Sequence, residues 1–208
     1  MSGKMVISGA ALVLLVGCVG DQSLPTGFEV RAPLFAAVGR AGESHLRTHV
    51  AGGNEVFTPG HPGDPTPADS RAQGEAIFRV SADGGTVEFR LIASNIDNVI
   101  MAHIHCGSPV ANGPIRMWLY PVIGPTGAPG PNGTGRHDGV LASGTFSPTG
   151  VVCPASAVGQ DMPLLDAMRA GLTYVNAHTN DGVAPANTGP GDFPGGEMRG
   201  QLASPRAN

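Results

Sequence analysis

Two alternating segments joined by a glycine-rich turn constrain the fold of this chain more than any other feature. Residues 75–80 and 86–92 flank the Asp-Gly-Gly tripeptide at 83–85, and every second residue from Val87 to Leu91 is apolar. Successive side chains of a strand point to opposite faces, so this alternation is typical of a strand with one buried face. Glycine provides the positive φ that short hairpin turns need. The two segments therefore predict an antiparallel β-hairpin.

Further short apolar segments predict an all-β domain. The 208 residues include 32 Gly and 19 Pro, which favour short strands and turns over helices. The additional expected strands are 45–50, 98–107, 115–120, 140–146 with an extension at 151–153, 173–179 and 197–202. In the last strand, Met198 and Leu202 are expected to face inward, and Glu197, Arg199 and Gln201 outward. About eight or nine short strands of this kind predict a Greek-key β-sandwich or barrel, immunoglobulin-like or superoxide-dismutase-like.

Residues 161–171 carry the helix pattern of the chain. Asp161 is the expected N-cap, Pro163 lies in the first turn and Gly171 ends the helix. The pattern predicts one short crossover helix. Glycine recurs at every third position from 124 to 133, and residues 124–139 are expected to form a long exposed loop.

Composition and charge exclude several classes of protein. The hydrophobic content is 41%, only 13% of residues are charged, and the net charge is −4. These values fit one globular domain, and the absence of a Lys/Arg cluster argues against nucleic acid as a partner. The sequence has no phosphate loop, no dinucleotide fingerprint and no nucleophile elbow.

The N-terminus indicates export. Residues 1–17 join a short cationic head to an apolar stretch that is too short to cross a bilayer comfortably, as in a signal peptide. The sequence Leu15-Val16-Gly17-Cys18 resembles the bacterial lipobox, which implies lipidation of Cys18 and a flexible tether over 18–42. The alternative is an ordinary secretory signal with a chance cysteine. The expected location is the extracytoplasmic side of a bacterial cell envelope, anchored to a membrane through the lipid.

Lipidation of Cys18 leaves two cysteines, Cys106 and Cys153. An exported compartment permits a disulfide between them. Closing this loop would lower the entropy of the unfolded chain and so stabilise the fold by about 4 kcal/mol. The alternative is a pair of unrelated buried thiols.

Two histidines interrupt the apolar stretch 98–107. In a strand, His103 and His105 share one face with Met101, while Ile104 and its alternate neighbours form a core face. Two adjacent imidazoles can chelate a transition metal or hydrogen-bond to neighbouring loops.

Five sequence blocks, in order, resemble the CHRD domain, which is named after the growth-factor-binding protein chordin. They are 54–56 (Asn-Glu-Val), 102–105 (Ala-His-Ile-His), 112–114 (Asn-Gly-Pro), 171–179, and 195–202 (Gly-Gly-Glu-Met-Arg-Gly-Gln-Leu). The resemblance implies an immunoglobulin-like domain over 43–204, followed by a tail at 205–208. The biochemical role of this family in microbes is largely undefined. We expect a binding or envelope-structural module with an extracytoplasmic protein as its partner, and we leave enzymatic activity open as the less favoured interpretation.

The histidine pattern is also similar to the copper side of copper/zinc superoxide dismutases. That resemblance implies that His103, His105 and His178 meet on the outside of the barrel and bind copper or zinc, with Arg199 guiding an anion. The alternative function is therefore a copper-binding protein or oxidoreductase. In the competing structural interpretation, His103 and His105 hydrogen-bond to loop carbonyls, and Glu55 and Arg199 form an ion pair that locks the first and last segments.

Overall fold

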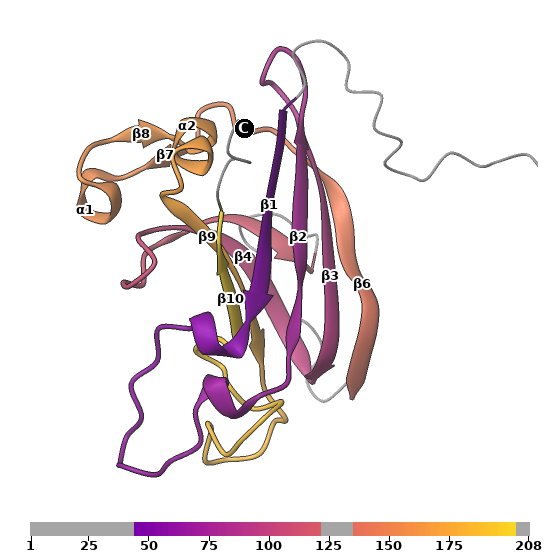
Figure 1. Ribbon diagram of the computed structural model, residues 1–208. Helices are drawn as coiled ribbons and strands as arrows, with labels where there is room; N and C mark the ends of the chain where they lie inside the picture. The colour runs from indigo at the N-terminus through magenta and orange to yellow at the C-terminus, as the bar shows by residue number, and fades with distance from the viewer. Residues whose placement is uncertain (1–43, 122–134, 203–208) are drawn as a thin grey trace, which may run out of the picture. The chain divides into compact units, whose positions relative to one another are not determined.

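Eight antiparallel strands form most of the domain (Figure 1). The computed structural model describes residues 44–121 and 135–202. The strands are β1 Ser44–Ala51, β2 Gln73–Val80, β3 Val87–Asp97, β4 Val99–Cys106, β5 Ile115–Tyr120, β6 Arg136–Phe146, β9 Thr173–Thr179 and β10 Met198–Gln201. They form one sheet in the order β5-β4-β9-β10-β1-β2-β3-β6, whose edge strands β5 and β6 come into contact. The sheet is thus nearly closed into a barrel, which confirms the predicted fold class.

Several predictions concern residues outside the described part of the chain. They are the signal peptide at 1–17, the lipidation site Cys18, the tether at 18–42, the tail at 205–208, and the loop over 124–134.

The predicted hairpin is present as β2 and β3. The two strands pair from Gln73↔Ser94 to Val80↔Val87. In the turn, the Asp83 carboxylate accepts hydrogen bonds from the Ser81 hydroxyl at 2.6 Å and from a backbone N–H at 2.9 Å. These bonds satisfy the polar groups of a tight turn, so the turn fixes the register of the hairpin.

The expected loop 124–139 is wrong at its C-terminal end. Residues from Arg136 onward belong to β6, which pairs with the far end of β3. The Asp138 carboxylate accepts a hydrogen bond from the Asn95 N–H at 2.7 Å and one from the Arg136 side chain at 2.8 Å. These polar contacts extend the ladder through a stretch whose glycines and charged residues concealed the strand period.

The core follows the period-two pattern of the strands. Side chains from both halves of the sheet meet inside the barrel, and they include Leu46, Phe78, Phe89, Leu91, Ile104, Val175, Ala177, Met198 and Leu202. Burial of these apolar side chains is the main driving force for folding. The inward face therefore orients every strand, and the opposite face of each strand remains available for other contacts.

Asn98 links the two halves of the sheet. It separates β3 from β4, which lie in different halves, so the chain crosses the barrel in a Greek-key manner at this residue. Asn98 has a positive φ of 52°. Its backbone bonds to Gly135 and Asn180, and its side-chain amide donates to the carbonyl of Gly191 at 3.2 Å. Asparagine tolerates this backbone conformation better than other side chains do.

The connection from β1 to β2 contains two short 3-10 helices, η1 Gly52–Asn54 and η2 Pro67–Asp69. The two helices pack together because Gly52 has no side chain, and a Cβ there would lie 1.9 Å from the Pro67 carbonyl oxygen. Glu55 follows η1 directly, so this packing sets its position.

The connection from β6 to β9 contains a small separate unit. It consists of the two-stranded sheet β7 Val152–Cys153 and β8 Met162–Pro163, and of the helices α1 Ala155–Val158 and α2 Leu164–Arg169. The crossover helix is thus present but shorter than expected. Among the described residues, no helix is long and apolar enough to cross a membrane.

Three details of that region were predicted wrongly. Asp161 does not cap the helix, because residues 162–163 pair with 152–153 as a strand, and its carboxylate accepts the Ala155 N–H at 2.7 Å instead. For the same reason, 151–153 does not extend the strand at 140–146. The sequence pattern placed Pro163 inside the helix, whereas in the structure it precedes the first helical residue.

Candidate metal site

The pairing of β4 with β9 brings the three histidines together. In this antiparallel ladder His103 lies opposite Asn176, His105 opposite Tyr174, and Met101 opposite His178. Directly opposed residues in a ladder share a face, so the alternate residues of both strands form one polar group on the side away from the core. This register places the His-x-His segment of β4 against the Tyr-x-Asn-x-His segment of β9.

The three imidazoles lie in contact with one another. Their ring centres are 5.4 Å apart for His103 and His105, 5.0 Å for His103 and His178, and 6.3 Å for His105 and His178. One nitrogen from each ring lies within 4.8 Å of the others. The three residues therefore form a histidine cluster with the donors of a possible metal site.

The histidine cluster is buried, which corrects the expectation that it lies exposed on the outside of the barrel. His103, His105 and His178 are 0%, 7% and 6% exposed. Trp118 on β5 packs against His103 with 4.3 Å between ring centres, and Tyr174 stacks on His105 at 4.8 Å. Aromatic side chains and loops thus cover the polar face that alternation alone would assign to solvent.

Two histidines are oriented by loop carbonyls, as the structural interpretation predicted for His105. His105 Nδ1 lies 2.7 Å from the Gly113 oxygen, and His178 Nδ1 lies 2.8 Å from the Pro194 oxygen. A proton on each Nδ1 makes these hydrogen bonds and leaves the lone pair on Nε2. The structural interpretation does not hold for His103, because neither of its nitrogens has a hydrogen-bond partner in the described structure.

The imidazoles are held in their neutral form. Burial, with repulsion from His178 and His105, lowers the pKa of His103 to about 3. Burial lowers the pKa of His178 to about 4, although the bond to Pro194 opposes the shift. Burial likewise lowers the pKa of His105. Neutral imidazole is the form that binds metal ions, so protons do not compete for these nitrogens near pH 7.

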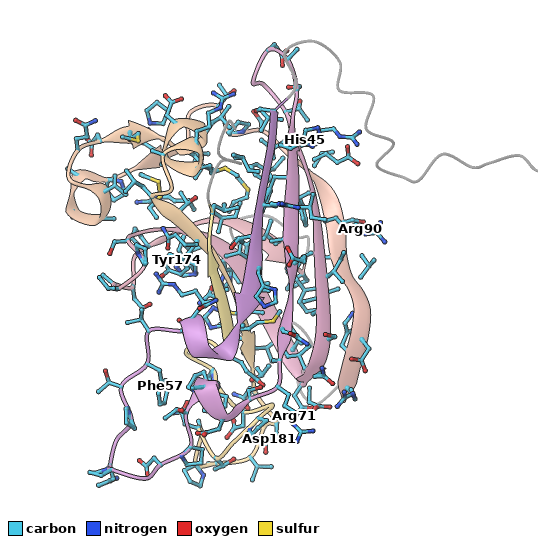
Figure 2. All side chains as sticks on the ribbon, in the orientation of Figure 1. His45, Phe57, Arg71, Arg90, Tyr174 and Asp181 are labelled. Atoms are coloured by element: carbon cyan, nitrogen blue, oxygen red, sulfur yellow. A yellow bond between two sulfur atoms is a disulfide. The ribbon has the colours of Figure 1, made fainter. Side chains whose placement is uncertain are left out.

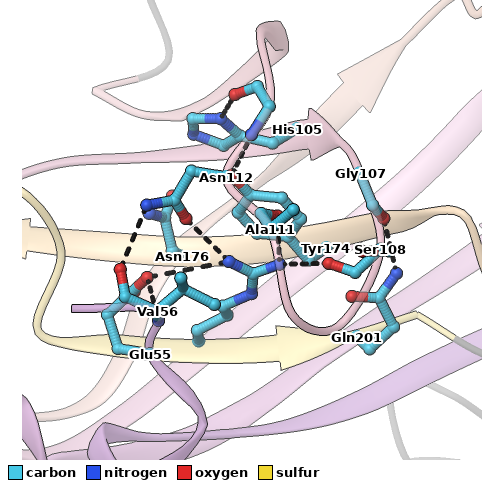
Figure 3. Close-up of polar contacts among 12 residues, drawn as sticks. Glu55, Val56, His105, Gly107, Ser108, Ala111, Asn112, Tyr174, Asn176 and Gln201 are labelled. Carbon is cyan, nitrogen blue, oxygen red and sulfur yellow. Dashed lines mark hydrogen bonds and ion pairs between the residues drawn. The ribbon is translucent and has the colours of Figure 1, made fainter. Parts of the chain in front are cut away.

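Arg199 lies beside the cluster but is engaged by the protein. Its guanidinium donates to Asn112 Oδ1 at 2.8 Å and to the carbonyls of Ser108 and Ala111 at 2.7 and 3.0 Å, which hold the loop between β4 and β5 (Figure 3). Arg199 is 1% exposed. The expectation that it guides an anion is therefore wrong, because its donors face the loop and not an open channel.

Glu55 and Arg199 form a buried pair, with 3.9 Å between Oε1 and Nη1 and both side chains 1% exposed. Burial raises the pKa of Glu55 to about 7, against the attraction of Arg199 and the Val56 N–H. Burial also lowers the pKa of Arg199. Both shifts favour the neutral forms, so desolvation outweighs the attraction within the pair that joins the first and last segments of the domain.

Glu197 is a second buried carboxylate, although alternation along β10 predicted that it faces outward. Its oxygens accept hydrogen bonds from the hydroxyls of Ser70 and Thr179 and from the Gly191 N–H. Gln201, also expected outside, donates to the Gly107 and Gly171 carbonyls at 2.8 Å each. Loops thus cover the outer face of β10, and its polar side chains are hydrogen-bonded to them.

A disulfide joins Cys106 to Cys153, with 5.6 Å between the Cα atoms (Figure 2). Cys106 ends β4 directly after His105, and Cys153 ends β7. The bond therefore fastens the small unit that contains α1 and α2 to the strand that carries two of the three histidines.

The sequence did not indicate three residues of this region as site residues, namely Asn176, Trp118 and Glu197. Asn176 could have been found from its place between Tyr174 and His178 in the alternating strand. Trp118 has no such local signature, because it reaches His103 from the neighbouring strand β5.

The comparison with known families agrees with the fold and with the five sequence blocks. The CHRD domain matches residues 46–202, from β1 through the residue after β10. No curated protein matches the chain. Because the match spans more than half of the chain and includes every residue of the histidine cluster, this protein belongs to the CHRD domain family.

Proposed function

We propose that this CHRD domain binds a divalent transition-metal ion, copper or zinc, through His103, His105 and His178. The observation that carries the proposal is the convergence of three neutral imidazoles, two of which have buried nitrogens without any hydrogen-bond partner in the described structure. A buried polar atom without a partner costs about 1–3 kcal/mol, and a bound ion would remove that cost. Imidazole nitrogen is a donor that both copper and zinc prefer.

The hydrogen bonds of the Nδ1 atoms support the proposal. Metal-binding histidines usually donate the other ring N–H to a carbonyl or carboxylate, which fixes the tautomer and the ring orientation. His105 and His178 have this arrangement with Gly113 and Pro194. Both rings are therefore prepared to present Nε2 as a ligand.

The spacing of the nitrogens also fits. Metal–nitrogen bonds of about 2.0–2.1 Å place the ligand atoms of a tetrahedral ion ~3.3 Å apart. The three nitrogens lie within 4.8 Å of one another. Binding of one ion therefore requires the nitrogens to approach one another by up to about 1.5 Å.

Burial of the cluster favours binding over turnover. A copper-dependent oxidoreductase would need a path for its substrate to the ion, whereas Trp118 and Tyr174 cover two of the imidazoles. Arg199, the cation that such an enzyme would use to attract an anion, is held by the loop at 108–112. We therefore assign a binding role, and superoxide turnover by the copper-loaded protein would contradict it.

The setting we propose is a lipid-anchored protein on the extracytoplasmic side of a bacterial envelope. The lipobox-like sequence ending at Cys18 supports the anchor, and a disulfide is compatible with an oxidising compartment. Labelling of cells with a palmitate analogue tests the anchor. If Cys18→Ala leaves labelling and membrane retention unchanged, the protein is not lipidated at this residue.

Titration of the purified protein with Cu(II) and Zn(II) tests the metal site. We expect one equivalent of tightly bound metal, and a large loss of affinity in His105→Ala. His61→Ala is the matched control, since His61 lies in a loop with its side chain 88% exposed. Absence of stoichiometric binding by the unaltered protein would remove the proposed function.

A further inference from the structure

Asn176 occupies the middle of the histidine cluster. It lies on β9 directly opposite His103, between Tyr174 and His178 in the alternating series, and it is 2% exposed. Its Oδ1 lies 3.1 Å from His178 Nε2. A short, buried amide at this point cannot be explained by packing alone, because an apolar side chain of the same size would fill the space equally well.

The two hydrogen-bonding neighbours of His178 cannot both be satisfied by a neutral imidazole. Nδ1 faces the Pro194 carbonyl oxygen and Nε2 faces Asn176 Oδ1, so both ring nitrogens point at oxygen atoms. A neutral imidazole has one N–H and can satisfy only one of them. With the proton on Nδ1, the Nε2 lone pair opposes a lone pair of the amide oxygen. A cation placed between the two atoms turns this repulsion into attraction.

The separation of the two atoms is also that of neighbouring ligands on one ion. Bonds of about 2.0–2.1 Å at tetrahedral angles give ~3.3 Å between ligand atoms, close to the observed distance between Nε2 and Oδ1. Three imidazoles leave a fourth position of a tetrahedral ion open, and the buried Asn176 amide lies beside them, with Oδ1 3.1 Å from His178 Nε2.

We propose that Asn176 Oδ1 is the fourth ligand of the metal site and that it makes the site selective for divalent ions. The inference rests on the proposed function. An amide oxygen is a hard donor, and Cu(II) accepts sites of mixed nitrogen and oxygen ligands, whereas Cu(I) prefers soft sulfur ligands. The site therefore discriminates between the two oxidation states of copper through one side chain.

Glu55 and Gly196 hold the amide in the required orientation. A Cβ on Gly196 would lie 2.5 Å from Glu55 Oε2 and 3.1 Å from Asn176 Nδ2, so both atoms border the space that this glycine leaves empty. The Asn176 amide lies close enough to Glu55 to lower the pKa of the carboxyl. Nδ2 is thus on the side of Glu55, and Oδ1 lies 3.1 Å from His178 Nε2.

The test compares Cu(II) and Cu(I) affinities of the full-length protein with those of Asn176→Leu and Asn176→Asp, by competition with chromophoric chelators. Loss of an outer-shell partner usually costs 10–100-fold in metal affinity, so loss of a ligand in Asn176→Leu should weaken Cu(II) binding by at least about tenfold. Cu(I) binding should change less. Asn176→Asp should retain Cu(II) and shift its visible and electron paramagnetic resonance spectra, because a carboxylate replaces the amide as ligand.

Thr173→Val is the matched control, because Thr173 is buried on the same strand, on its other face, and its hydroxyl has no hydrogen-bond partner among the described residues. Its Cu(II) affinity should equal that of the unaltered protein. Thermal unfolding of each variant shows whether it folds.

Two results would overturn the inference while leaving the three-histidine site intact. One is unchanged or tighter Cu(II) binding in Asn176→Leu, which would mean that the amide presents its NH₂ group to His178 and competes with the metal. The other is an unaltered Cu(II) spectrum in Asn176→Asp, which decides the question even if the leucine variant does not fold. Failure of the unaltered protein to bind Cu(II) would instead reject the proposed function.

Discussion

The guanidinium carbon of Arg199 lies 3.4 Å from the centre of the Tyr174 ring. The His105 imidazole stacks on the same ring, with 11° between the planes. A guanidinium and an imidazole cannot occupy one face, so Tyr174 is sandwiched between them. Its hydroxyl accepts the Gly113 N–H at 3.0 Å, and the Gly113 oxygen is the partner of His105. One tyrosine thus connects the buried ion pair with the histidine cluster.

Removal of the Arg199 charge should destabilise the fold strongly. Arg199→Met leaves Glu55 buried without its partner, and breaking a buried pair in this way costs about 3–5 kcal/mol. Because Arg199 lowers the pKa of Glu55, the loss should be larger at pH 8.5 than at pH 6, where the carboxyl can remain neutral. Urea unfolding at both pH values measures it. Addition of Glu55→Gln should recover part of the loss at the higher pH, and a pH-independent loss would contradict this account.

Acid should destabilise the metal-free protein through the histidines. The unfolded chain protonates them near pH 6.5, but folded His103 and His178 do so only near pH 3 and 4, so between these limits the unfolded state binds more protons. The free energy of unfolding should therefore fall by about 2 kcal/mol per histidine from about pH 6.5 to 4.5, at about 1.4 kcal/mol per pKa unit. The raised pKa of Glu55 acts in the opposite sense.

Two variants separate these contributions in urea unfolding across that pH range. His103→Phe should flatten the loss of stability on acidification, and Glu55→Gln should steepen it. An unchanged pH dependence in His103→Phe would show that this histidine is not the buried neutral group described above.

A side chain at Gly196 should disturb the region around Asn176. Gly196 has a φ of 132°, and a Cβ there would collide with Glu55. Gly196→Ala should therefore cost about 2 kcal/mol or more, since it adds a clash to backbone strain of about 1–3 kcal/mol. Gly189→Ala is the matched control, because its φ is 153° and a Cβ would meet nothing within 4 Å. Equal losses in thermal unfolding would mean that contact with Glu55 is unimportant.

Loss of the Cys106–Cys153 disulfide should lower the free energy of unfolding by about 4 kcal/mol, from the chain entropy of a loop of this length. The variant that carries both Cys106→Ala and Cys153→Ala, compared with the oxidised protein in urea, measures the loss. Reductant should weaken the oxidised protein and leave the double variant unchanged.

Copper binding should quench the fluorescence of Trp118. It is the single tryptophan of the chain, and its ring centre lies 4.3 Å from that of His103. Paramagnetic Cu(II) at the cluster should quench the emission in proportion to bound metal, whereas Zn(II) should not quench it. Emission that is indifferent to stoichiometric Cu(II) would place the ion elsewhere in the protein.

The strands could be predicted because they depend on the two-residue period, whereas the meeting of the three histidines was expected from the resemblance to the copper side of superoxide dismutases. That period assigns His103, His105 and His178 to the face opposite the core. It does not tell whether loops cover that face, so Glu197, Arg199 and Gln201 were expected outside, although the first two are buried and Gln201 is half-buried. Their burial depends on long-range hydrogen bonds, such as those from Arg199 to residues 108–112, and no local pattern contains that information.

The helix shows a second limit. Asp161 and Pro163 favour the N-terminus of a helix, but in the structure Met162 and Pro163 pair with β7 as a strand. The disulfide at Cys153 fixes the end of β7, so a contact distant in sequence decided the local conformation.

The position of β10 has a consequence for how the protein is made. This strand lies between β9 and β1, where Met198 to Gln201 pair with β9 and Arg199 pairs with Ala51. During synthesis, the ladder that joins the early half of the sheet to the later half cannot form until residue 201 has emerged. Closure of the sheet, and with it the contact of Arg199 with the loop at 108–112, therefore waits until almost the whole domain has been made.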